Sequence, residues 1–332
     1  MLLLRNENHE TARRIVGVIG LGLIGQAVVA SLRKRGFQQF HFQKLDWSSP
    51  QRLHEELLET NDSLLREFAT QLSTSGPANA EERFDPFRGD FDLVWCAGRA
   101  GFAATDCDAN RELDAFDTVL QWAEELATSR GIQIHVSMMS SAGGLYEGQQ
   151  RVDEQTPCRP CRPYGQLKLS QERRLRESPS VSRRRVFRPT SVYGWLRTGQ
   201  RKGLIPTLIH NGLRNQETSF VGSLNTLRDY VWVDDVGEIV VRSLTHNSEA
   251  EPAFSTHLIA SGQPSSIFQI KHLVENAIGR RVQLKFSSQA SNALDTTFSA
   301  SVLRDGWPRT DMSVSIRRIA ADFSSNGLRT DG

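Results

Sequence analysis

Short apolar runs alternate with stretches of helical periodicity over the first part of the chain. Residues 14–19 form an apolar, β-branched run, and residues 26–34 carry apolar positions at helical spacing. A second strand is predicted over residues 38–45, followed by a long amphipathic helix over residues 50–71. Strands that alternate with helices are typical of a parallel sheet.

The alternation resumes after a stretch rich in small and polar residues, 73–90. Residues 91–97 predict a buried strand, residues 110–127 a helix and residues 132–138 the next strand. The expected fold class is therefore α/β, a Rossmann-like doubly wound parallel sheet with helices on both faces. Ligands of such a sheet bind at the carboxyl ends of its strands.

Beyond residue 195 the pattern breaks into shorter pieces, and 332 residues exceed what one hydrophobic core usually holds. We predict a dinucleotide-binding Rossmann domain over residues 11–195, with an inserted segment at about 46–90. A smaller C-terminal lobe over residues 196–325 is expected to bind mainly substrate. Within that lobe, residues 229–244 could return to the Rossmann domain.

Charge and composition exclude several classes of partner. Forty basic against 38 acidic residues give a formal net charge of +2, too balanced to attract nucleic acid or anionic membranes. The first residues hold only three consecutive leucines, too few for a signal peptide or a membrane span. We therefore expect a cytoplasmic protein. Cys158 and Cys161 lack the second pair of ligands that a zinc site needs, so no metal is expected.

A glycine-rich turn lies where the first predicted strand meets the first helix, in the sequence Gly20-Leu-Gly22-Leu-Ile-Gly25. The first glycine permits a tight turn, the second lets the backbone approach a pyrophosphate, and the third lets the helix pack on the strand. The N-terminus of the helix faces the anion. The residues expected to hold a dinucleotide are Gly20, Gly22, Leu23, Ile24 and Gly25.

The identity of the dinucleotide stays open between NAD and NADP. Asp46 lies 21 positions after Gly25, within range of a ribose 2′-hydroxyl and hence of NAD. Lys44 could instead meet the 2′-phosphate of NADP. Either residue could equally be solvated surface.

A further cofactor contact is expected after the strand at residues 91–97. The residues concerned are Ala97, Gly98 and Arg99, and the arginine is about as compatible with a plain surface position.

Tyr164 and Lys168 lie four residues apart at the start of a predicted helix, so their side chains project from one face. A phenol with an ordinary pKa near ~10 is a poor base, but a neighbouring ammonium and the cofactor's positive ring favour the phenolate. Tyr164 could then exchange a proton with a substrate hydroxyl while a hydride moves to or from the nicotinamide. A serine hydroxyl nearby would bond the same oxygen.

The order and approximate spacing of these features resemble the extended short-chain dehydrogenase/reductases, and among them the NAD-dependent nucleotide-sugar epimerase/dehydratase family. The resemblance runs from Ile15 to about Phe323. Residues 187–194 (FRPTSVYG) are similar to the family's R-P-x-N-x-Y-G, residues 228–235 (RDYVWVDD) to R-D-Y-I-x-V-x-D, and residues 306–308 (GWP) to G-W-x-P. It implies that Tyr164 and Lys168 also contact the cofactor, and that Arg228, Asn110 and Ser191 lie at the substrate.

Three positions depart from the family pattern. Ile19 occupies the place of the family's first glycine, and Ser191 replaces the asparagine of R-P-x-N. Counting back from Tyr146, the usual catalytic Ser or Thr falls on Ala142, so the hydroxyl would come from Ser141 or, as a second choice, Ser140.

The resemblance implies an epimerase of a nucleotide sugar, acting at C4 through a transient keto intermediate. One alternative is an NADP(H)-dependent reductase of a nucleotide-linked keto-sugar that uses the same residues. Another is a non-catalytic dinucleotide-binding sensor or scaffold. The expected partner is a small nucleotide sugar, with neither nucleic acid nor a membrane involved, and the chain could assemble as a homodimer.

Overall fold

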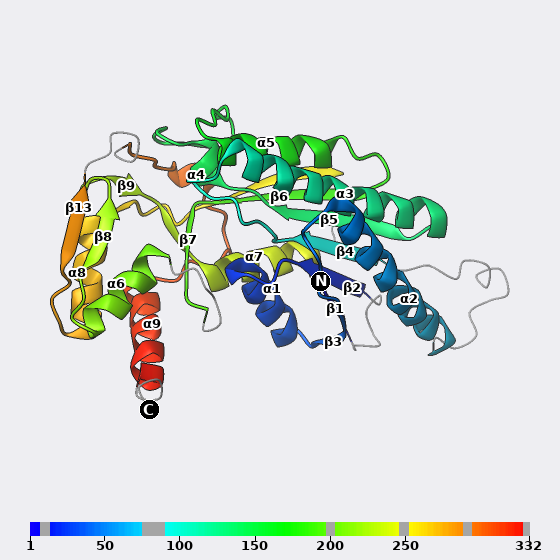
Figure 1. The fold of residues 1–332 in the computed structure, drawn as a ribbon, viewed down its shortest axis with the longest axis horizontal. Helices are drawn as coiled ribbons and strands as arrows, with labels where there is room; N and C mark the ends of the chain where they lie inside the picture. The colour runs from blue at the N-terminus through cyan, green and yellow to red at the C-terminus, as the bar shows by residue number, and fades with distance from the viewer. Residues whose placement is uncertain (7–13, 75–89, 197–202, 246–251, 288–293, 328–332) are drawn as a thin grey trace.

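The computed structural model describes residues 1–6, 14–74, 90–196, 203–245, 252–287 and 294–327. A central sheet of seven strands has the order β11-β6-β5-β4-β2-β1-β3 (Figure 1). In chain order its strands are β1 (Leu2–Asn6), β2 (Arg14–Ile19), β3 (Phe37–Phe42), β4 (Asp90–Trp95), β5 (Gln133–Met139), β6 (Arg183–Pro189) and β11 (Phe254–Ile259). The Rossmann-like α/β fold expected from the sequence is confirmed.

Helices cover both faces of this sheet. One face carries α1 (Leu23–Lys34) and α7 (Val233–Thr245). The other carries α2 (Pro50–Thr74), α3 (Asp106–Arg130) and α5 (Pro163–Arg176), packed side by side. The central strands β2, β4 and β5 are almost entirely buried, which agrees with their continuous apolar runs.

Local sequence signals define where α3 begins and ends. Thr105 and Asp108 form a reciprocal capping box at its start, and Gly131 ends it in the left-handed conformation with φ +66°. α5 begins with Pro163 in its first turn, where the missing N–H costs nothing. These signals fix both ends of α3 and the start of α5, the helix that carries Tyr164 and Lys168.

β1 lies between β2 and β3 and is antiparallel to both. Leu2 is the register partner of Val18 on one side and of Phe42 on the other. Leu3 and Leu4 are completely buried. The three opening leucines were considered only as part of a leader or membrane segment, so this strand was not predicted.

The segment after β3 was predicted as an insertion at about 46–90. Its helix α2 packs against α3 and contributes Leu53, Leu57, Leu64 and Phe68 to the core on that face of the sheet. Residues 75–89, and with them most of the stretch predicted as a loop, lie outside the described residues.

α1 and α7 are held together at close range. A Cβ at Gly237 would lie 2.6 Å from the carbonyl oxygen of Ala27, so only glycine fits there. Glu238 on α7 accepts hydrogen bonds from the Arg35 guanidinium and from the Ser31 hydroxyl. α7, from the stretch predicted as a possible return to the Rossmann domain, therefore packs on the same face of the sheet as α1.

A second group of elements, at the left of Figure 1, packs around its own apolar core. It consists of α6 (Leu204–Leu213), β8 (Thr218–Val221), α8 (Ile267–Ile278), β13 (Leu284–Ser287) and α9 (Met312–Gly327). Short pairs join this group to the main sheet: β7 (Ser191–Tyr193) with β10 (Tyr230–Trp232), and β9 (Leu227–Arg228) with β12 (Ser265–Ser266). Among the described residues, no helix has the length and apolar character needed to cross a bilayer.

Candidate active site

The three glycines of the turn between β2 and α1 occupy different environments. Gly20 has φ +88°, and a Cβ there would lie 2.3 Å from the Ala97 nitrogen at the end of β4. A Cβ at Gly25 would lie 1.9 Å from the Gly20 carbonyl oxygen. A Cβ at Gly22 would meet nothing within 4 Å. Gly20 and Gly25 therefore close the turn, whereas Gly22 borders open space.

That open space lies at the N-terminus of α1. Gly22 is the N-cap and supplies no side-chain hydrogen bond, and the first turn of α1 holds no acidic residue. Helix-terminal N–H groups without a side-chain acceptor favour a bound anion. Gly22, Leu23, Ile24 and Gly25 thus fit the pyrophosphate of a dinucleotide, as the sequence motif predicts.

Lys44 and Asp46 both lie on the surface after β3. The Asp46 carboxylate accepts a hydrogen bond from the Ser48 backbone N–H at 2.8 Å, and this bond lowers the pKa of Asp46 below its ordinary value. Because β1 separates β3 from β2, neither residue follows a strand adjacent to the glycine turn. Their assignment to the cofactor ribose stays a prediction.

Tyr164 and Lys168 stand on one face of α5, as their spacing predicts. The Lys168 Nζ lies 5.9 Å from the centroid of the Tyr164 ring. A Cβ at Gly144 would lie 3.0 Å from two carbons of that ring, so the turn after β5 packs directly against the tyrosine. The structure therefore brings together the serine-bearing strand end and the Tyr-Lys pair.

The two candidate serines have different partners. Ser140 donates to the Glu172 carboxylate at 2.5 Å, and the same carboxylate binds the Arg188 guanidinium. Ser141 is the N-cap of α4 (Ala142–Leu145), and its Oγ accepts from the Gly144 N–H at 3.1 Å. A hydroxyl that accepts at its oxygen can still donate its proton. The contacts favour Ser141 over Ser140 as a donor to a substrate.

Phe102, in the loop after β4, packs against the ring of Tyr164 with centroids 5.7 Å apart. The guanidinium carbons of Arg162 and Arg228 lie 5.5 and 6.0 Å from the Phe102 centroid. The phenylalanine is 42% exposed. Arg228 and Tyr164 thus both lie beside Phe102, a residue that the sequence did not predict as part of the site, and the role of Arg228 at the substrate stays a prediction.

Lys168 has a buried partner that the sequence analysis also missed. Its Nζ lies 3.0 Å from Oε1 of Glu112 on α3 and 3.1 Å from Oε1 of Gln171. The other oxygen of Glu112 accepts from the backbone N–H groups of Arg99 and Ala100, at 2.9 and 3.0 Å. Gly98 is close as well, because a Cβ there would lie 2.7 Å from Oε1 of Glu112. The loop expected to meet the cofactor is therefore tied to Lys168 through one carboxylate.

A signal for Glu112 was present in the sequence. Ala109 and Phe116 are buried positions on the apolar face of α3, and residue 112 falls between them at helical spacing, three after one and four before the other. A glutamate on an apolar face needs a buried partner. Asn110, which the resemblance placed near the active site, is exposed two residues earlier on the same helix.

The segments that resemble other family motifs hold parts of the fold together. Ser191, in β7, donates its backbone N–H to the Asp229 carbonyl oxygen at 3.1 Å. The Asp229 carboxylate accepts from Thr190 and from residues 261 and 262, and the residue is buried. These contacts account for Asp229 structurally, and the predicted substrate contact of Ser191 stays a prediction.

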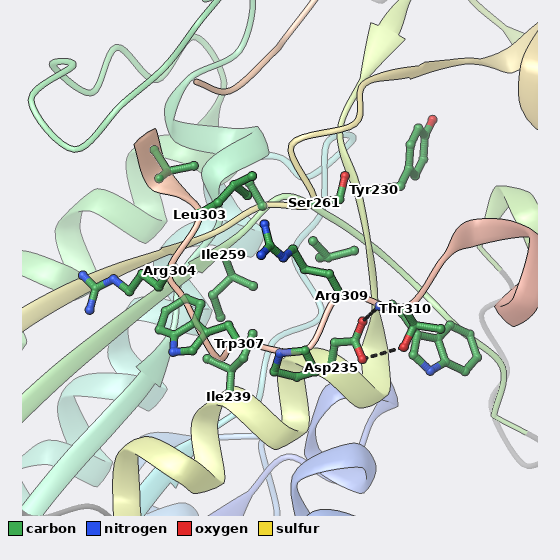
Figure 2. Close-up of a pocket in the computed structure, with 15 residues that line it drawn as sticks. Tyr230, Asp235, Ile239, Ile259, Ser261, Leu303, Arg304, Trp307, Arg309 and Thr310 are labelled. Atoms are coloured by element: carbon green, nitrogen blue, oxygen red, sulfur yellow. Dashed lines mark hydrogen bonds between the residues drawn. The ribbon is translucent and has the colours of Figure 1, made fainter. Parts of the chain in front are cut away.

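Figure 2 shows a pocket between β11, α7 and residues 302–310. Asp235 accepts from the backbone N–H and the hydroxyl of Thr310, and Trp307 lies on the opposite side of the pocket. None of the predicted catalytic residues lines it. The G-W-P segment thus serves to fasten the C-terminal part of the chain onto α7 and β11.

Comparison with known proteins agrees with this geometry. The model of the family described as "NAD dependent epimerase/dehydratase family" matches residues 16–255. A protein of Methanocaldococcus jannaschii that carries the provisional name UDP-glucose 4-epimerase is 25% identical over 233 residues, which are 67% of this chain and 73% of that protein.

Solved structures with the same fold include two complexes with nicotinamide dinucleotides. The UDP-glucose 4-epimerase of Thermus thermophilus, in complex with NAD, superimposes with a TM-score of 0.70 at 17% identity, covering 94% of this chain and 99% of that one. RMD from Pseudomonas aeruginosa, complexed with NADPH, gives a TM-score of 0.67 at 21% identity, with the same coverage. These likenesses extend over the C-terminal elements as well as the main sheet.

Proposed function

The chain belongs to the NAD-dependent epimerase/dehydratase family, and from this premise we propose that it epimerises a nucleotide sugar at C4 through a transient keto intermediate. The observation that carries the proposal is the meeting of Tyr164, Lys168 and the Ser141 turn at the end of β5. The glycine turn, which fits a dinucleotide, lies at the same edge of the sheet, against the end of β4. The prediction of NAD or NADP as cofactor is confirmed for the family.

In this proposal each residue acts on the sugar at a stated atom. The Tyr164 phenolate takes the proton of the reacting hydroxyl and later returns it. Lys168 supplies positive charge beside the phenol, and the Ser141 hydroxyl donates to the same sugar oxygen. A bound nicotinamide supplies a hydride acceptor and donor. The guanidinium of Arg228 binds the diphosphate, a task that suits its two parallel N–H donors.

Phe102 lies between the proposed base and the proposed diphosphate ligand. A hexose whose hydroxyl reaches Tyr164 and whose phosphates reach Arg228 would lie along this ring. An aromatic face offers a flat apolar surface for such a sugar. Glycine at position 143 leaves room there, since a Cβ would lie 3.6 Å from the Phe102 ring and 3.9 Å from the Ser141 Oγ.

A reductase of a nucleotide-linked keto-sugar is the second candidate, and one contact favours it. The Asp46 carboxylate is engaged by Ser48, while Lys44 is exposed nearby and suits a 2′-phosphate. A reductase would exchange NADP(H) at each turnover, whereas an epimerase regenerates its cofactor within one closed site. The reductase therefore consumes one NADPH for each sugar converted, whereas the epimerase consumes none.

The deciding experiment supplies the purified protein with UDP-glucose or UDP-N-acetylglucosamine and no added NAD(P)H. Exchange of C4 epimers, followed by NMR, is the expected result. Stoichiometric consumption of added NADPH with a keto-sugar, without epimer exchange, would establish the reductase instead. Retained dinucleotide with neither activity would point to the non-catalytic sensor or scaffold.

Assembly and location follow from the same proposal. We expect the enzyme to act in the cytoplasm and to assemble as a homodimer. Light scattering on the purified protein measures the assembly directly.

A further inference from the structure

We propose that Glu112 is a positioning residue which fixes the ammonium of Lys168 and thereby sets the pH at which Tyr164 works as a base. This inference rests on the proposed function only in taking Tyr164 as the base. It concerns a residue of α3 that the resemblance to known enzymes does not assign.

Lys168 has a limited number of hydrogen-bond donors. An ammonium has three N–H donors and no acceptor. Glu112 and Gln171 accept from the Nζ at 3.0 and 3.1 Å. One donor therefore remains for the tyrosine or a bound ribose, and the two fixed partners determine its direction.

The ion pair between Lys168 and Glu112 is buried. The side chains of Lys168 and Glu112 are only 6% and 8% exposed. Coulomb interactions between buried groups are screened far less than those at the surface. The charge of Glu112 therefore acts strongly on its surroundings and partly offsets the positive charge that Lys168 presents to Tyr164.

The Glu112 carboxylate is itself held in place by the backbone. Its second oxygen accepts from two consecutive backbone N–H groups, of Arg99 and Ala100. Those residues lie in the loop that continues to Phe102, whose ring packs on Tyr164. One carboxylate thus links the loop after β4, the lysine and, through Phe102, the environment of the phenol.

Several other ionisable groups close to Tyr164 and Lys168 have partners other than Glu112. Arg162 is paired with Glu147, and Glu172 with Arg188, while Cys96 is a neutral thiol whose pKa burial raises to about 12. Among the described residues, Arg99 donates its backbone N–H to Glu112, and the guanidinium of Arg228 lies beside Phe102. A change in the titration of Tyr164 after substitution of Glu112 alone therefore reports on Glu112.

The chain allows that titration to be measured directly, without turnover. It has four tyrosines, and burial raises the pKa of Tyr193 and Tyr230 to about 12 and that of Tyr146 still further. Phenolate absorbance near ~295 nm, recorded against Tyr164→Phe as the blank, isolates the Tyr164 phenol.

In Glu112→Gln the midpoint of this titration should move to lower pH by about half a unit or more, because the ammonium is no longer offset. Asp114→Asn, which removes an exposed charge from the same helix, should leave the midpoint in place. The acidic limb of the kcat/KM profile should move with the phenol. If Glu112→Gln does not fold, as judged by circular dichroism, Glu112→Met should give the same shift.

An unmoved midpoint, or one that rises, in a folded Glu112 variant overturns the proposal, since a purely structural glutamate would lower stability without moving the titration. The outcome is separable from the proposed function. A protein that shows the shift but turns over no sugar nucleotide refutes the epimerase and keeps the positioning role. Normal epimerisation with an unmoved midpoint supports the epimerase and refutes the positioning role of Glu112.

Discussion

The proposed role of Tyr164 depends on the residues that surround its ring as well as on its phenol. The phenol stands over Lys168 on α5, against Gly144 on one side and Phe102 on the other. Phe102, which packs on the Tyr164 ring, also lies beside the guanidinium of Arg228. Removing the Tyr164 hydroxyl should affect proton transfer and little else.

We expect Tyr164→Phe to lower turnover by about 10²-fold or more, because only the proton-transfer group is lost. Dinucleotide affinity, measured by calorimetry, should change little, since the glycine turn is untouched. Turnover close to that of the unaltered protein would remove Tyr164 from the mechanism.

The Tyr-Lys pair was predictable from sequence because both residues belong to one helix, where a spacing of four fixes their relation. The choice between Ser140 and Ser141 was not. It depends on Glu172 of α5, which accepts from Ser140 and is itself paired with Arg188 of β6. Phe102 was missed for the same reason, because its partners come from two other segments, the start of α5 and β9.

At the scale of elements, the turn between β2 and α1 contains one glycine that we assign to cofactor binding, Gly22, and one that close packing requires, Gly25. We expect Gly22→Ala to weaken NAD(P) binding by about tenfold or more while thermal stability is kept, since its Cβ meets no protein atom but would project toward the pyrophosphate. Calorimetry with NAD and NADP, together with thermal unfolding, measures both effects.

Gly25→Ala is the matched control for this prediction. Its Cβ would collide with the Gly20 carbonyl oxygen, so the substitution should destabilise the folded protein by about 2 kcal/mol or more. Equal loss of stability in both variants would show that the open space beside Gly22 has no functional meaning.

The contact between α1 and α7 should make the free energy of unfolding depend on pH. Hydrogen bonds from the Arg35 guanidinium are the main cause that lowers the pKa of Glu238 in the folded protein. A carboxyl with a depressed folded pKa stabilises the protein above its ordinary pKa of 4.5 and loses this contribution as pH falls below it.

We therefore expect Glu238→Gln to reduce the free energy of unfolding at pH 7 and to have less effect near pH 3, because the contribution is lost only as pH falls toward the depressed folded pKa. Urea denaturation at both pH values measures the difference. An equal effect of the substitution at the two pH values would show that the charge of Glu238 is immaterial to the helix contact.

The strands and helices that were predicted correctly share a local signal, as in the apolar run of β4 and the capped α3. β1 carries no such signal. Its three leucines are equally compatible with several structures, and its place in the sheet is decided by pairing with both β2 and β3. Partners on two separate strands are invisible to a pattern read along the chain.

At the scale of the whole molecule, a bound nucleotide sugar would bridge two groups of elements. Tyr164 belongs to the helices on the main sheet, whereas Arg228 lies on β9, next to the C-terminal elements. We expect Arg228→Ala to weaken binding of the nucleotide sugar by about tenfold or more, the loss typical of a charge-assisted hydrogen bond. Calorimetry with UDP-glucose should show this loss with dinucleotide affinity nearly unchanged.

Thermal unfolding gives a second reading of the same prediction. A ligand that binds only the folded state raises its stability by mass action, so UDP-glucose should stabilise Arg228→Ala less than the unaltered protein. Loss of dinucleotide binding with sugar-nucleotide binding intact would contradict the assignment of Arg228.

The place of β1 has a consequence for cofactor choice. Neighbouring strands are about 4.8 Å apart, so an intervening strand puts the end of β3 about twice that distance from the end of β2. A side chain at position 44 or 46 must cover an additional strand width to reach the adenosine ribose of a dinucleotide held at the glycine turn. The short Asp46 side chain cannot cover that width, whereas the longer Lys44 side chain can. Lys44→Glu should therefore shift the ratio of affinities from NADP toward NAD, and Asp46→Asn should alter it little.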